Sequence, residues 1–167
     1  MKTIIIIQTV LAYFVGISSL LIVYKLLNTY LRRQYEIAEN NIAYAIFQVG
    51  IILGTSLILS SVIDPGVNAI RFINQQDFNL TTLLLSTAYI ILFIAIGIFF
   101  SILTIAGSVF TLFQMTKVNE WQEIKNNNIS VAIISAALII GLSFIIGKYV
   151  GNLCEIIVPY PEVLNIR

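Results

Sequence analysis

The sequence predicts an all-α polytopic membrane protein of four transmembrane helices, formed by two parallel-related helical hairpins. Three observations lead to this fold class: a composition that is 59% hydrophobic and 10% charged, four long windows without a charged residue, and an internal repeat. Soluble domains carry about 25% charged residues, and the mean hydropathy here is +0.97. We therefore expect residues 1–167 to form a single membrane domain.

Charged residues are absent from four windows, at 3–24, 40–63, 78–116 and 126–147. About 20 helical residues cross a hydrocarbon core of about 30 Å, so each window is long enough for one span. The third window exceeds one span. Because Asn79, Thr81 and Thr82 offer a helix start, we place that span at 83–107.

The first window has two interpretations. Lys2 followed by an apolar run is typical of a secretory signal peptide. The run is longer than a typical signal core, however, and no clear small-x-small cleavage site follows it. We therefore expect an uncleaved membrane helix that ends near Leu27.

Basic residues predict the orientation. With the amino terminus outside, the inner loops contain Lys25, Arg32, Arg33, Lys117 and Lys125, and the outer segments contain Lys2, Arg71, Lys148 and Arg167. The pair Arg32–Arg33 directly after the first helix favours an inner loop there under the positive-inside rule. Both termini are therefore predicted outside the cytoplasm.

The internal repeat aligns residues 40–63 with residues 127–150, and nine of the 24 aligned positions are identical. The matches include an Asn pair and Gly54 over Gly141. Two helices per unit give both units the same orientation, so the predicted duplication has its pseudo-twofold axis along the membrane normal. The expected parts are repeat one at 1–63, an outer loop at 64–82, repeat two at 83–150 and a tail at 151–167.

A polar stretch, NEWQEIKNNN at 119–128, precedes the last apolar window and is echoed by YEIAENN at 35–41. With the small and apolar residues that follow, it resembles the signature of the YjfL-like bacterial inner-membrane family. These are short four-helix proteins that carry a domain of unknown function. The resemblance is close over 119–143 and implies a bacterial inner-membrane location and a link to envelope stress or remodelling. It implies no activity. The first copy lacks the Trp and Lys of the second, so the two sites need not be equivalent.

The polar residues that precede the second and fourth helices are candidates for capping or for a cytoplasmic entrance. They are Glu36, Asn40, Asn41, Glu123, Asn127 and Asn128. We interpret the four Asn residues as helix caps. The alternative is a shared anion or head-group site at two helix amino termini, although Glu36 and Glu123 already occupy that field. Glu120 is expected in a solvated loop, and Trp121 is expected to anchor in the head-group layer.

Small residues predict where helices pack. Gly50 and Gly54 form a GxxxG motif, and Ala137 and Gly141 repeat the spacing. Such faces let transmembrane helices approach closely, either within one chain or between chains. Gln48 and its repeat counterpart Ser135 are interpreted as interhelical hydrogen-bonding residues, with a pore lining as the alternative.

Motifs for chemistry are missing from the sequence. It contains no His and one Cys, Cys154, and it lacks phosphate-loop and dinucleotide motifs. We therefore predict no enzyme, no catalytic residue, no metal and no cofactor. A net charge of +1 predicts no nucleic-acid partner. Charged residues are also absent near the predicted midplane, which disfavours an ion-coupled carrier.

The sequence favours a scaffold or envelope-stress component of the bacterial inner membrane. Its expected partners are the lipid bilayer and either further copies of the chain or other membrane proteins. The alternative is a passive channel or small-solute transporter with polar entrances at the starts of the second and fourth helices.

Overall fold

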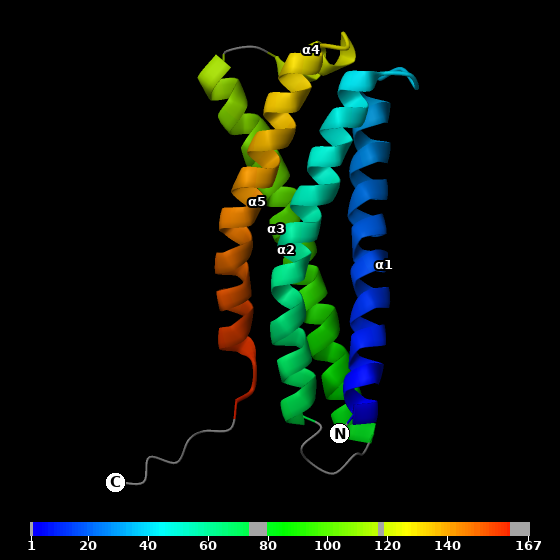
Figure 1. Ribbon diagram of the computed structural model, residues 1–167, viewed down its shortest axis with the longest axis vertical. Helices are drawn as coiled ribbons and strands as arrows, with labels where there is room; N and C mark the ends of the chain where they lie inside the picture. Colours follow the sequence, from blue (N-terminus) through cyan, green and yellow to red (C-terminus); the bar gives the residue numbers. More distant parts are fainter. Residues whose placement is uncertain (1, 74–79, 117–118, 161–167) are drawn as a thin grey trace, which may run out of the picture.

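The computed structural model describes residues 2–73, 80–116 and 119–160, with side chains from residue 13 onward except those of 15 and 83. The helices are α1 (Lys2–Tyr35), α2 (Ile42–Ile73), α3 (Leu80–Thr116), α4 (Glu120–Lys125) and α5 (Ile129–Ile157). Four of them run along the long axis of the molecule, and the short α4 caps one end (Figure 1). We call this the α4 end. The start of α1 and the end of α5 lie at the opposite end.

The all-α prediction is confirmed, because the described residues form helices and turns and no strand. Three helices, α2, α3 and α5, are long and apolar enough to cross a membrane. The chain therefore has the helices of a membrane protein. The predicted first span at 3–24 falls within α1, but many of its side chains are outside the described set, so the fourth span stays a prediction.

Several helices extend beyond their predicted bounds. α1 continues past Leu27, α2 runs through Pro65 into the predicted outer loop, and α5 continues seven residues into the predicted tail, to Ile157. The extension of α2 has a buried face that includes Ala69, which packs in one cluster with Cys154 from α5. Burial of this face stabilises the helix where the local sequence predicts a loop, because packing outweighs local propensity.

The closest helix pair is α2 with α5, which make the most extensive contact in the bundle. A Cβ atom on Gly50 would lie 2.6 Å from the Ala136 Cα, and one on Gly54 would lie 2.7 Å from the Ile139 Cγ2. Glycine therefore lets the two backbones touch at Gly50 and lets the side chains of α5 pack directly on the α2 backbone at Gly54. α3 crosses obliquely behind this pair, from the α1 side towards the far side of α5 (Figure 1).

The predicted pseudo-twofold relation is not seen in the helix pairing. α3 contacts both α2 and α5, whereas α1 contacts α2 and, within the described residues, does not reach α5. The face of α5 also differs from the one that the repeat predicts. Ala137 and Gly141 are exposed, and α5 presents Ala136 and Gly147 to α2 instead. Neighbouring positions on a helix point about 100° apart, so α5 is rotated relative to the repeat alignment.

Candidate functional site

The polar residues that the sequence singles out gather at the α4 end, where Asn41 holds two segments together. Its Oδ1 accepts a hydrogen bond from the Tyr44 backbone N–H at 2.7 Å, which caps the start of α2. Its Nδ2 donates to the carbonyls of Ile124 at 2.7 Å and Lys125 at 3.1 Å. Asn41 therefore caps α2 and also ties it to the end of α4.

The second Asn pair completes this connection. Asn128 is the N-cap of α5, and its Oδ1 accepts from the Val131 backbone N–H at 3.3 Å. Asn127 has a positive φ of 63° and does not cap its own helix. Its Oδ1 accepts instead from the Ala43 backbone N–H at 3.0 Å, across the interface at the start of α2. The α1–α2 turn and the α4–α5 turn therefore interlock.

The remaining entrance residues lie at the rim of this interface. Asn40 is exposed, and Glu123 accepts a hydrogen bond from the Asn128 Nδ2 at 2.8 Å. Glu36 forms an ion pair with Lys125 at 3.6 Å, but its side chain is 85% exposed. Exposed pairs of this kind contribute about 0–1 kcal/mol. Asn41, Asn127 and Asn128 thus bond mainly to backbone groups at helix ends, which supports capping over a shared anion site.

A polar cluster between α1 and α2 lies one layer deeper in the bundle. The Asn28 Oδ1 accepts hydrogen bonds from the Tyr44 hydroxyl at 2.9 Å and from the Gln48 Nε2 at 2.7 Å. Gln48 therefore makes an interhelical bond, whereas the Ser135 hydroxyl donates to the Val131 carbonyl of its own helix at 2.8 Å. Sequence reasoning missed Asn28. Asn28 lies four residues before Arg32, so the two residues share one face of the helix. This spacing is the sequence signal that could have placed Asn28 near the polar end of the bundle.

We expect Asn28→Leu to lower the free energy of unfolding by about 1–3 kcal/mol, because the Tyr44 and Gln48 donors lose their shared acceptor. Adding Gln48→Leu should recover part of this loss, because it removes the Gln48 donor that Asn28→Leu leaves without an acceptor. Thermal unfolding of the two single variants and the double variant in detergent measures this coupling. Strictly additive losses would contradict a direct hydrogen bond.

Aromatic rings connect α4 to the long helices. The Trp121 ring stacks on Tyr35 with centroids 4.9 Å apart, and it meets Phe47 edge-on at 5.3 Å. The predicted membrane anchor is therefore also a contact between α1, α2 and α4. Burial, and then the neighbouring Tyr30 phenol, raise the pKa of Tyr35 above its usual value of 10.0, so this ring stays neutral at physiological pH.

Glu120 corrects one expectation from the sequence. It was expected in a solvated loop, yet the residue is only 3% exposed. The Thr116 hydroxyl donates to its Oε1 at 3.0 Å, and Leu112 and Val131 lie around it. α4 rests on α3 and α5, so the first residue of α4 turns inward. The burial of Glu120 follows from where this six-residue helix packs, and the local sequence does not predict that position.

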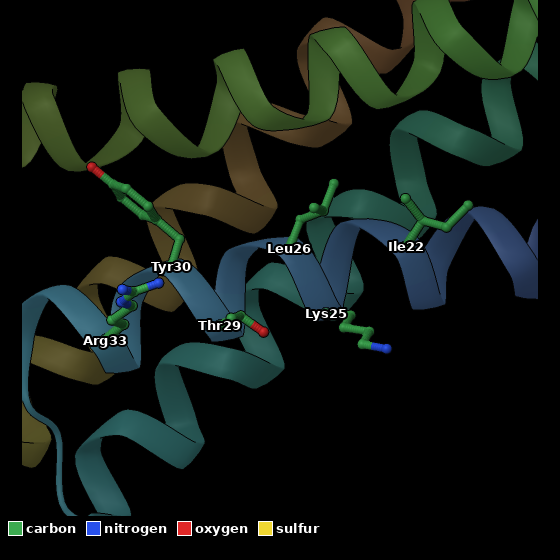
Figure 2. Close-up of a pocket in the computed structure, with 6 residues that line it drawn as sticks. All are labelled: Ile22, Lys25, Leu26, Thr29, Tyr30 and Arg33. Atoms are coloured by element: carbon green, nitrogen blue, oxygen red, sulfur yellow. The ribbon is translucent and has the colours of Figure 1, made fainter.

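A basic groove runs along an exposed face of α1 near the same end. Six residues line its volume of about 600 Å³: Ile22, Lys25, Leu26, Thr29, Tyr30 and Arg33. Figure 2 shows Lys25, Thr29 and Arg33 one turn apart along α1, with Tyr30 reaching towards α3. Along α1, the first lining residue, Ile22, is apolar and the last, Arg33, is a cation. This order is expected where a helix leaves the hydrocarbon and its basic side chains reach anionic head groups.

Comparison with known proteins places the chain within one family. A family model described as Domain of Unknown Function (DUF350) matches residues 2–150. No curated protein matches the chain, and no solved structure matches it.

Proposed function

Since the chain belongs to the DUF350 family, whose function is unknown, we propose that it is a non-catalytic membrane scaffold. In this proposal it assembles as a homo-oligomer or with other membrane proteins through the outward face of α5. The YjfL-like resemblance of residues 119–143 supports a role in the bacterial inner membrane and in envelope stress or remodelling.

One observation carries the proposal: the predicted repeat has two small-residue pairs, and within the described residues only one of them is packed against another helix. Gly50 and Gly54 are buried against α5. Ala137 and Gly141 are exposed, and a Cβ atom on Gly141 would meet nothing within 4 Å. Lipid provides no hydrophobic drive for helix association, so small faces of this spacing favour contact with another helix.

The packing of the bundle argues against the channel alternative within one chain. The backbones of α2 and α5 touch at Gly50 and Ala136, so this central contact has no room for a solute. The hydroxyls of Ser101, Thr104 and Ser108 donate to carbonyls four residues earlier in α3. These side chains are satisfied by their own helix. These observations favour the scaffold over a solute path through the α2–α5 contact.

We expect Gly141→Leu to reduce the size of the assembly in detergent without lowering the thermal stability of the chain. The added side chain has free space within the chain but would block a close helix contact outside it. Light scattering of the purified protein measures the mass of the assembly. Gly107→Leu on α3 is the matched control, because a Cβ atom there also meets nothing within 4 Å. If both variants keep the wild-type mass, the α5 face is not an interface.

The proposed topology places both termini outside the cytoplasm. Lys25, Arg32, Arg33 and Lys125 all lie towards the α4 end of the described helices, which supports a cytoplasmic α4 end. Single cysteines at Lys2, Gln34 and Asn126, in a Cys154→Ala background, test it. A membrane-impermeant thiol reagent should label position 2 in intact cells and leave positions 34 and 126 unlabelled. The reverse pattern would invert the topology.

A further inference from the structure

The basic groove on α1 consists of two lines of side chains, each repeating at every fourth residue. The apolar line is Ile22, Leu26 and the ring of Tyr30, and the polar line is Lys25, Thr29 and Arg33. Residues four apart lie on one face of a helix, so each line extends for about 12 Å along α1. Figure 2 shows Leu26 and Tyr30 on the side towards α3 and Lys25 on the side away from it. The groove therefore offers an elongated ligand an apolar wall beside a row of polar groups.

Within the residues that the structure describes, the polar line has no partner. The ion pair found there joins Lys125 to Glu36, so Lys25 and Arg33 have no carboxylate beside them. The Thr29 hydroxyl makes no hydrogen bond in this set, whereas hydroxyls on α3 donate to carbonyls of their own helix. All three side chains of the line are exposed. Two cations and a free hydroxyl favour an anionic ligand, because phosphate forms strong, charge-assisted hydrogen bonds with such groups.

The position of the groove along α1 indicates which anion meets it. The charge-free window at 3–24 ends directly before Lys25. A helix over this window is about 33 Å long, close to the thickness of about 30 Å of a hydrocarbon core. With this window as the predicted first span, Ile22 lies at the edge of the acyl chains, and the polar line lies among the head groups. The anions at that depth are lipid phosphates.

We propose that the basic groove is a binding site for one anionic phospholipid. An acyl chain lies along Ile22 and Leu26, and Lys25, Thr29 and Arg33 hold the phosphate and the rest of the head group. A zwitterionic lipid has the same phosphate but adds a cation of its own, which the two basic side chains repel. The site is independent of the scaffold role, because α1 does not reach α5 within the described residues.

Competition between two lipids tests the proposal. The full-length protein in detergent receives equal concentrations of phosphatidylglycerol and phosphatidylcholine with the same acyl chains. Mass spectrometry of the intact protein then measures the ratio of the two lipid adducts. We expect phosphatidylglycerol to exceed phosphatidylcholine by at least about tenfold, because each basic residue near a membrane surface adds to the attraction for anionic lipid. A ratio near one would overturn the proposal.

A pair of matched variants separates the groove from the general charge of the protein. The double variant Lys25→Gln/Arg33→Gln should lose most of the selectivity, and its adduct ratio should fall towards one. Arg71→Gln/Lys148→Gln removes the same charge from exposed positions on α2 and α5 and should keep the wild-type ratio. If the first double variant does not fold, Lys25→Gln alone should lower the ratio at least about threefold. An unchanged ratio in the groove variants, or an equal loss in the control, would overturn the proposal.

A soluble competitor distinguishes a lipid from a free phosphate. Glycerol phosphate carries the charge of the head group without acyl chains. It should displace phosphatidylglycerol only in at least about tenfold excess, because it gains nothing from the apolar line. Displacement at equal concentration would assign the groove to a free anion and overturn the lipid site.

Discussion

Gly50→Ala is expected to lower the free energy of unfolding by about 1–3 kcal/mol, the usual effect of overpacking a well-filled contact. The new methyl group would lie 2.6 Å from the Ala136 Cα and 2.8 Å from its Cβ. A backbone atom cannot rotate away, so α5 as a whole would have to move. At Gly54 the opposing atoms are the side-chain ends of Ile139 and Ser143, so Gly54→Ala should cost less.

The control variants should keep or slightly raise the stability of the chain. A Cβ atom on Gly107 or Gly141 would meet nothing within 4 Å. Ala is favoured over Gly in a helix interior by about 0.5–1 kcal/mol, so Gly107→Ala should be neutral or stabilising. Thermal unfolding of the variants side by side in detergent is the measurement. Equal melting temperatures for Gly50→Ala and Gly107→Ala would contradict the close α2–α5 contact.

The sequence predicted the class of the fold well because charge is excluded from hydrocarbon regardless of tertiary structure. The windows at 40–63 and 126–147 lie almost wholly within α2 and α5 for this reason. Helix ends were predicted less well. Pro65 and the polar residues around it read as a loop, whereas the packing of Ala69 and Ile73 keeps this segment helical. Such long-range packing leaves little local signal.

The predicted repeat aligns residues along the chain, but the aligned residues do not lie on equivalent faces. It aligns Gly141 with Gly54, yet only Gly54 is buried. The alignment fixes which residues correspond along the chain, whereas the rotation of α5 depends on how α3 and α2 pack on it. α1 and α3, the two first helices of the repeats, pack differently. The two last helices therefore have different surroundings despite their similar sequences.

The candidate site was predicted in part. Local signals identify Asn41 and Asn128 as caps, because the bonded N–H lies three residues ahead in each case. The bond from Ala43 to Asn127 joins residues 84 apart, and no local pattern indicates it. Burial of Glu120 likewise depends on contacts with α3 and α5.

Asn41 is the second position where we expect a large effect. Asn41→Ala removes the cap of α2, worth about 0.5–2 kcal/mol. It also removes the amide donor that the carbonyls of Ile124 and Lys125 share. Asn41 itself is only 7% exposed. The Ile124 carbonyl keeps a hydrogen bond from the Asn127 N–H at 3.0 Å, so the Lys125 carbonyl is the group that loses its partner. A buried group without a partner costs about 1–3 kcal/mol, so the total loss should be about 2–4 kcal/mol.

The substitution series at Asn41 separates its two roles. Asn41→Asp keeps a good cap but replaces the amide donor by a carboxylate facing two carbonyl oxygens, so it should be no more stable than Asn41→Ala. Asn128→Asp keeps the cap of α5 but loses the donor to Glu123, at the rim of the interface, and should lose less. Asn40→Ala, at an exposed position, should unfold like the wild type. Thermal unfolding of the four variants measures this order. If Asn41→Asp were as stable as the wild type, capping alone would explain Asn41, and the interlocking of the two turns would contribute nothing to stability.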